Sequence, residues 1–108
     1  MSSDDEAEYE RVSQEAVAAC RNLSPPYHPE LWIQMTHRWG AAEAARRLLV
    51  SGDIQYGFIR LIEAGRHDLT VEWSVLLPRW HDIFSAQHRE AARWRLQQAG
   101  VQLPPWAS

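Results

Sequence analysis

Apolar residues recur along most of this chain at the three- and four-residue spacing of an amphipathic helix, and no stretch alternates as a β-strand does. Breaks that contain proline, glycine or aspartate separate these stretches, because proline cannot continue a helix and glycine favours its end. The pattern therefore predicts an all-α fold, a single compact domain of five or six short helices. The helices are expected over residues 8–23, 29–39, 41–50, 54–64, 68–77 and 86–99.

The densest part of the pattern covers residues 56–73 and reads as helix, stop, turn and helix start. We expect Gly65 at positive φ just after a helix, a position that favours glycine. Asp68 or Thr70 is expected to accept a hydrogen bond from the first turn of the next helix. The bulky residues of this part of the chain are expected to share one core: Phe58, Leu61, Leu69, Trp80 and Phe84.

The charge divides the chain unevenly. Five acidic residues and no basic residue lie in the first ten positions, which leaves nine acidic residues against eleven Arg, and there is no Lys. We expect residues 1–8 to be a flexible acidic N-terminus, residues 9–100 a helical domain and residues 101–108 an extended C-terminal tail. A body that is only weakly basic argues against strong attraction to phosphate backbones.

Composition and spacing exclude several kinds of site. The single cysteine, Cys20, excludes an internal disulfide and a cysteine-based zinc site. The five histidines form no pair at helical ligand spacing, so no metal site is expected. Arg66, His67 and Asp68 resemble a catalytic triplet, but they occupy a helix stop and a helix start, where capping is the simpler role. We therefore expect no catalytic residue, no cofactor and no enzymatic activity.

The absence of a long apolar run and of a signal-like N-terminus predicts a cytoplasmic protein that does not enter a membrane. Six Trp in 108 residues suggest a contact surface, because Trp and Arg are enriched at binding hot spots. On the last helix, Trp94 lies opposite the apolar face. We expect a non-enzymatic module that binds another protein or a second copy of itself, through Trp73, Trp80, Arg93 and Trp94.

A DNA- or RNA-binding role is the alternative. Residues 41–64 have the lengths of a helix-turn-helix pair, although a hairpin buried within a bundle has the same lengths. The residues that would face nucleic acid are Arg46, Arg47, Gln55, Tyr56 and Arg60.

The block Gly57-Phe58-x-x-Leu61-x-x-x-Gly65-Arg66-x-Asp68-Leu69-Thr70-Val71-Glu72 resembles the core of a family of short bacterial helical proteins that have no assigned activity. Pro78, Trp80 and Phe84 continue the resemblance, which covers roughly residues 27 to 100. This chain departs from the family pattern at His67 and Trp73. The resemblance implies a shared helical fold and no particular chemistry.

Overall fold

Helices form almost all the regular structure of the chain, and the computed structural model describes residues 2–51 and 56–107. Within those ranges no residue belongs to a β-strand, which confirms the all-α fold. The elements are α1 (Ser2–Arg21), α2 (Glu30–Trp39), α3 (Ala41–Val50), α4 (Tyr56–Glu63), η1 (His67–Leu69), α5 (Val71–Leu76), η2 (Pro78–Trp80), α6 (Ala86–Gln98) and η3 (Pro105–Ala107), where η marks a single 3₁₀ turn.

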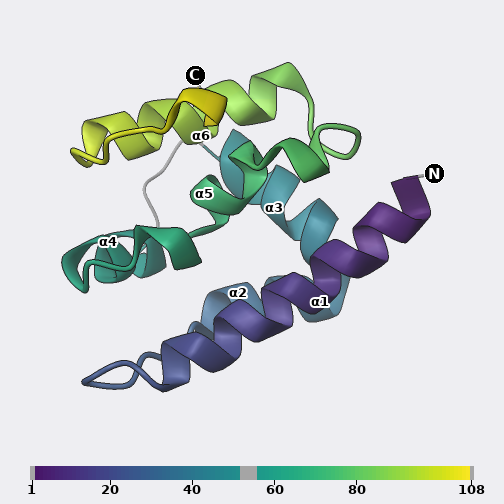
Figure 1. Cartoon of the computed structure of the whole chain (residues 1–108). Helices are drawn as coiled ribbons and strands as arrows, with labels where there is room; N and C mark the ends of the chain where they lie inside the picture. Colours follow the sequence, from purple (N-terminus) through teal and green to yellow (C-terminus); the bar gives the residue numbers. More distant parts are fainter. Residues whose placement is uncertain (1, 52–55, 108) are drawn as a thin grey trace.

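Helix α3 is the centre of the arrangement. It packs against α1 and α2 on one side and against α5 and α6 on the other (Figure 1). The alanines of α3 are almost wholly buried at Ala41, Ala44 and Ala45, and their small side chains let neighbouring helices approach closely. Helix α4 is not among these main partners of α3, and the turn of the helix-turn-helix pair predicted for residues 41–64 lies partly outside the described residues.

Helix α1 begins at Ser2, within the segment that the sequence predicts to be flexible. Its first turns have partners in the body of the protein. The carboxylate of Glu6 lies 2.6 Å from the guanidinium of Arg46. Tyr9 is 2% exposed, packs edge-on against two aromatic rings of the core, and shares a 2.7 Å hydrogen bond with Ser74. These contacts explain why the helix extends through the acidic segment.

A side chain of α1 also caps α3. Gly40 precedes α3 at φ 81° and has no side chain with which to cap it. The carboxylate of Glu10 accepts a hydrogen bond of 2.8 Å from the backbone N–H of Ala41 instead. A negative charge at this end of a helix is favourable, because the N-terminal N–H groups are unpaired and the helix dipole is positive there.

The helix-end signals predicted for Gly65 and for Asp68 or Thr70 are confirmed, and a further cap lies at the start of α6. Gly65 has φ 72°, in the left-handed region. The hydroxyl of Thr70, not the carboxylate of Asp68, accepts the backbone N–H of Trp73 at 3.1 Å. Ser85 caps α6, and the ring of His88 accepts the N–H of Ser85 in return, which completes a capping box.

The predicted core is confirmed in part. Phe58, Trp80 and Phe84 belong to one buried cluster. Leu61 is buried outside that cluster, and Leu69 is only half-buried, because both face a pocket that is described below. The C-terminal segment is not an extended tail throughout. Val101 and Leu103 pack against the core and the segment ends in η3, where Ala107 is 2% exposed.

Candidate functional site

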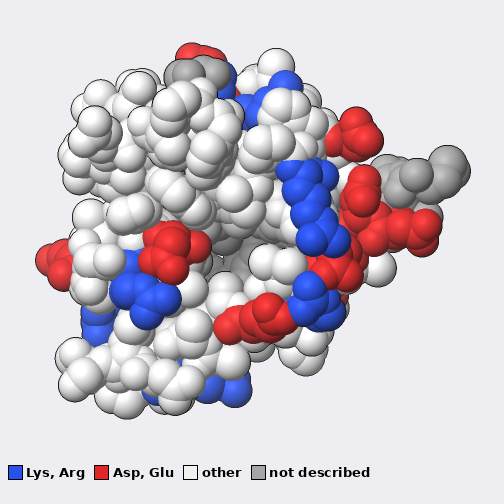
Figure 2. All heavy atoms as spheres, in the orientation of Figure 1, with Lys and Arg blue, Asp and Glu red and all other residues white. Residues whose placement is uncertain are grey.

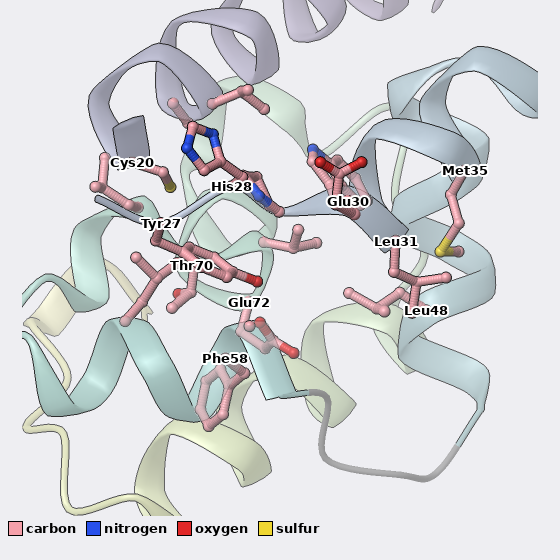
Figure 3. Close-up of a pocket in the computed structure, with 18 residues that line it drawn as sticks. Cys20, Tyr27, His28, Glu30, Leu31, Met35, Leu48, Phe58, Thr70 and Glu72 are labelled. Atoms are coloured by element: carbon pink, nitrogen blue, oxygen red, sulfur yellow. The ribbon is translucent and has the colours of Figure 1, made fainter. Parts of the chain in front are cut away.

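A pocket of about 300 Å³ lies between α1, α2, α4 and α5 (Figure 3). Most of its wall is apolar, and five separate parts of the chain contribute to it, including Leu48 of α3. The wall consists of Ala16, Val17, Cys20, Tyr27, His28, Pro29, Glu30, Leu31, Trp32, Met35, Leu48, Gly57, Phe58, Leu61, Leu69, Thr70, Val71 and Glu72. We call this space the Glu72 pocket, since Glu72 supplies the one almost wholly buried charged side chain of its wall.

Glu72 and Arg95 form an ion pair behind the pocket. Nη1 of Arg95 donates to Oε2 of Glu72 at 3.0 Å. The side chain of Glu72 is 1% exposed and that of Arg95 is 3% exposed. Nη2 of Arg95 donates to the backbone carbonyls of Leu48 and Leu49 at 3.2 and 3.5 Å. These carbonyls lie in the last turn of α3, where the negative end of the helix dipole favours a cation.

The surroundings of Glu72 act on its protonation. Burial raises the pKa of the Glu72 carboxyl, although its own backbone N–H and the Arg95 guanidinium favour the charged form. Oε2 is bound to Arg95, whereas no side chain among the described residues binds Oε1. Glu72 lines the pocket, and a carboxylate has about four acceptor positions, so it can accept a hydrogen bond from a further group.

Gly57 allows one wall of the pocket to close. A Cβ placed on Gly57 would overlap the hydroxyl group of Tyr27. The tyrosine ring can lie directly on the backbone of α4 only because this residue has no side chain. Nearby, burial raises the pKa of Cys20, as expected for a thiol that behaves as a small apolar group.

A second feature is the group of aromatic side chains along α5, α6 and η3. Trp94 is 55% exposed and Trp106 is 41% exposed. The rings of Trp73 and Trp106 pack edge-to-face with centroids 5.4 Å apart. Arg93 donates to the backbone carbonyl of Ala107 at 3.3 Å, which holds η3 along α6. We call Trp73, Arg93, Trp94 and Trp106 the aromatic surface.

Trp80 does not belong to this surface, so its prediction as a surface residue is wrong. It is 1% exposed and packs edge-on against Tyr9, with Arg79 over its ring at 4.8 Å. The 3₁₀ turn that Pro78 begins directs Trp80 into the core. Its indole N–H has no hydrogen-bond partner among the described residues, which is a cost that the packing of the ring must offset.

The arginines of the alternative nucleic-acid surface are engaged in other contacts. Arg46 binds Glu6, Glu43 and the carbonyl of Ile83, and Arg47 pairs with Glu43. Arg60 donates to the carbonyl of Pro25 at 2.7 Å. On the face that Figure 2 shows, acidic side chains lie next to the basic ones. Gln55 and the side chain of Tyr56 lie outside the described residues.

The triplet of residues 66–68 is a local structure at a helix start. Nε and Nη2 of Arg66 donate to the two carboxylate oxygens of Asp68, each at 3.1 Å. This hydrogen bonding lowers the pKa of the Asp68 carboxyl. The ring of His67 packs on Trp73 with centroids 4.7 Å apart.

In residues 2–51 and 56–107, no three His, Cys, Asp or Glu side chains are close enough to bind a metal ion together. None of the described helices has the length and apolarity of a membrane span.

The sequence pattern includes Glu72 in the block of residues 57–72 and does not connect it with Arg95. A signal was present, because Arg95 lies within the apolar stripe that Ala92 and Leu96 form on α6. Glu72 similarly lies three and four positions before Val75 and Leu76, which are both buried. A charged residue within an apolar stripe indicates a buried partner.

Comparison of the chain with protein-family models, curated proteins and solved structures found no match. The geometry described above is therefore the basis for any functional conclusion.

Proposed function

We propose that this protein is a non-enzymatic binding module that acts through protein–protein contact at the aromatic surface. The observation that carries the proposal is the exposure of Trp94 on α6. Ala92, Arg95 and Leu96 are buried on one face of this helix, while Trp94 lies on the opposite face with 55% of its surface exposed. A Trp side chain buries more apolar area on association than other residues do, so its exposure costs free energy in the unbound protein.

The surroundings of Trp94 support the same proposal. Arg93 precedes it on the helix, and Trp106 presents a second large apolar side chain in the segment that Arg93 binds. Trp and Arg are the residue types that contribute most to binding free energy in interfaces. Trp73 and Arg93 each contact η3, so part of this surface is ordered before a partner arrives, which reduces the entropy lost on binding.

Nucleic-acid binding through α3 and α4 has less support. The guanidinium groups of Arg46 and Arg47 are paired with carboxylates, and the guanidinium group of Arg60 donates a hydrogen bond to a backbone carbonyl. To bind phosphate, these arginines would have to give up their carboxylate and carbonyl partners. The binding free energy gained from the release of counterions would be smaller by that cost.

The test compares the parent with Trp94→Ala in two measurements. Light scattering gives the solution mass over a range of concentrations, and a binding assay measures capture of a partner from the host. Loss of Trp94 should weaken association by about 2 kcal/mol or more, the range of a hot spot, with little change in the melting temperature. A monomer at all concentrations that captures the same proteins with and without Trp94 would contradict the proposal.

Trp39→Ala is the matched control. Trp39 is a half-buried Trp on α2, covered by Arg38 and Arg47 at 5.0 and 4.3 Å from its ring. Its removal deletes the same side chain from another part of the surface, so association should be unchanged. Equal loss of association in both variants would mean that the effect does not belong to the aromatic surface.

A further inference from the structure

We propose that the Glu72 pocket binds an uncharged small molecule that has an apolar body and one hydrogen-bond donor, with Oε1 of Glu72 as the acceptor. This site goes beyond the proposed protein contact, and none of its residues belongs to the aromatic surface. The argument rests on the size of the pocket, on the nature of its wall, and on the charge balance of the Glu72–Arg95 pair.

The size of the pocket suits a small ligand. Its volume of about 300 Å³ is at the lower end of the range for ligand sites in proteins. A cavity of about half this volume, engineered into the core of another protein, accommodates benzene.

The wall of the pocket favours an apolar body. Figure 3 shows Leu31 and Met35 of α2 on one side of the space and Phe58 of α4 on another, and Leu61 of α4 also belongs to the wall. Leu31 is 55% exposed although it lies at this wall, so a ligand that covers it would remove apolar surface from water. Water in the pocket finds few polar partners on this part of the wall and is readily displaced by an apolar group.

The polar end of the ligand is defined by Glu72. One carboxylate oxygen is held by Arg95, while the other has no side-chain partner among the described residues. The Glu72 side chain is only 1% exposed, so a group that binds it must come from within the pocket. A carboxylate has about four acceptor positions, more than Arg95 and the backbone N–H of Glu72 occupy, so a ligand hydroxyl or amide N–H that reaches Oε1 can donate a hydrogen bond to it.

The charge balance selects an uncharged donor. The ionised carboxylate of Glu72 and the guanidinium of Arg95 together carry no net charge. An ammonium ligand would leave a net positive charge in an apolar site, where desolvation is unfavourable. An anionic ligand would meet the carboxylate of Glu72 first, because Arg95 lies behind it and also donates to two backbone carbonyls.

The experiment uses four probes that share one ring and differ at the polar end. Benzyl alcohol carries a neutral donor, benzyl methyl ether carries none, benzylamine is a cation and benzoate is an anion. Binding at millimolar concentrations is followed by chemical-shift changes of the backbone amides of the full chain. We expect the alcohol to shift amides of α2, α4 and α5, and to bind on the order of tenfold more tightly than the ether. The two charged probes should bind more weakly than the alcohol.

Two variants locate the binding. Ala16→Leu fills the pocket from α1 without touching the ion pair and should abolish binding of the alcohol, whereas Ala7→Leu changes an exposed position on the same helix and should leave it unchanged. Trp94→Ala should bind the alcohol as the parent does, which separates this proposal from the protein contact. No binding by any probe, an ether that binds as well as the alcohol, tightest binding of benzylamine or benzoate, or binding unaffected by Ala16→Leu would overturn the proposal.

Discussion

The carboxylate of Glu72 on α5 accepts a hydrogen bond from Arg95 on α6 at 3.0 Å, and both side chains are almost completely buried. Arg95 continues from this pair to the last turn of α3 through the carbonyls of Leu48 and Leu49. Three helices are therefore joined by one guanidinium group. Because a buried charge without a partner is very unfavourable, this pair restricts how the three helices can pack against one another.

Removal of Glu72 should destabilise the fold strongly. Glu72→Ala leaves Arg95 buried without its carboxylate, and we expect a loss of about 3–5 kcal/mol in the free energy of unfolding. Glu72→Gln retains an acceptor for Arg95 and should lose less. Chemical denaturation followed by circular dichroism measures both, with the exposed Glu63→Ala on α4 as a control that should unfold like the parent. Unfolding of Glu72→Ala at the parent's midpoint would contradict this role for the pair.

The capping box of α6 should make stability depend on pH. Nδ1 of His88 accepts the backbone N–H of Ser85 at 3.2 Å, and burial, with a contribution from Arg46, lowers the pKa of His88. Protonation of Nδ1 removes the acceptor. The folded pKa lies below the ordinary value, so this stabilisation is complete above pH about 6.5 and is lost as the pH falls through the folded pKa.

His88→Gln does not titrate, and a glutamine at this position can complete the same box. Relative to this variant, the parent should lose up to about 1 kcal/mol of stability between pH 7.5 and pH 5. Denaturation at the two pH values measures the difference. His81→Gln, at an exposed position, is the control and should lose the same stability between the two pH values as the parent does. A parent and a His88→Gln variant with parallel pH profiles would exclude this effect.

Glu10 should stabilise α3 although it belongs to α1. Its carboxylate accepts the N–H of Ala41 at 2.8 Å, so Glu10→Ala leaves the start of α3 without a side-chain cap. We expect a loss of about 1 kcal/mol, as for removal of a capping side chain within one helix. Glu15→Ala removes an exposed carboxylate that pairs with Arg11 on the same helix and should change the melting temperature little. Equal shifts in the two variants would show that the cap contributes nothing.

Gly65 should resist substitution because of its backbone conformation alone. It has φ 72°, and apart from its two chain neighbours no atom of the described residues would lie within 4 Å of a Cβ there. Gly65→Ala should therefore cost about 1 kcal/mol through the left-handed conformation. Gly65→Asn should cost less, since asparagine adopts that conformation more readily. Thermal melts of the two variants test this order, and the reverse order would be inconsistent with a conformational cause.

Trp80 and Trp94 should respond in opposite ways. Trp80→Ala removes a side chain that is 1% exposed and should cost roughly 3–5 kcal/mol of stability by leaving a cavity. Trp94 is more than half exposed, so Trp94→Ala should leave the denaturation midpoint close to that of the parent. Both variants are measured under the same conditions. A Trp94→Ala variant that is as unstable as Trp80→Ala would mean that Trp94 has a structural role.

The sequence by itself determined that the helices exist and where several of them end. Gly65, Thr70 and Ser85 act within four residues along the chain, since positive φ and N-terminal capping depend on local geometry. The exposure of Trp94 also followed from helical spacing, because the apolar positions of α6 define the buried face. These features required no knowledge of how the helices pack.

The tertiary structure decided the partners of the charged residues and the existence of the pocket. Arg95 lies 23 residues from Glu72, and Glu10 lies 31 residues from the N–H that it caps. The acidic segment became helical through contacts with α3 and α5 that local composition does not contain. Helical periodicity identifies which face of a helix is buried, but many arrangements bury the same faces. Only the packing of α1, α2, α4 and α5 against one another brought the side chains of the Glu72 pocket together.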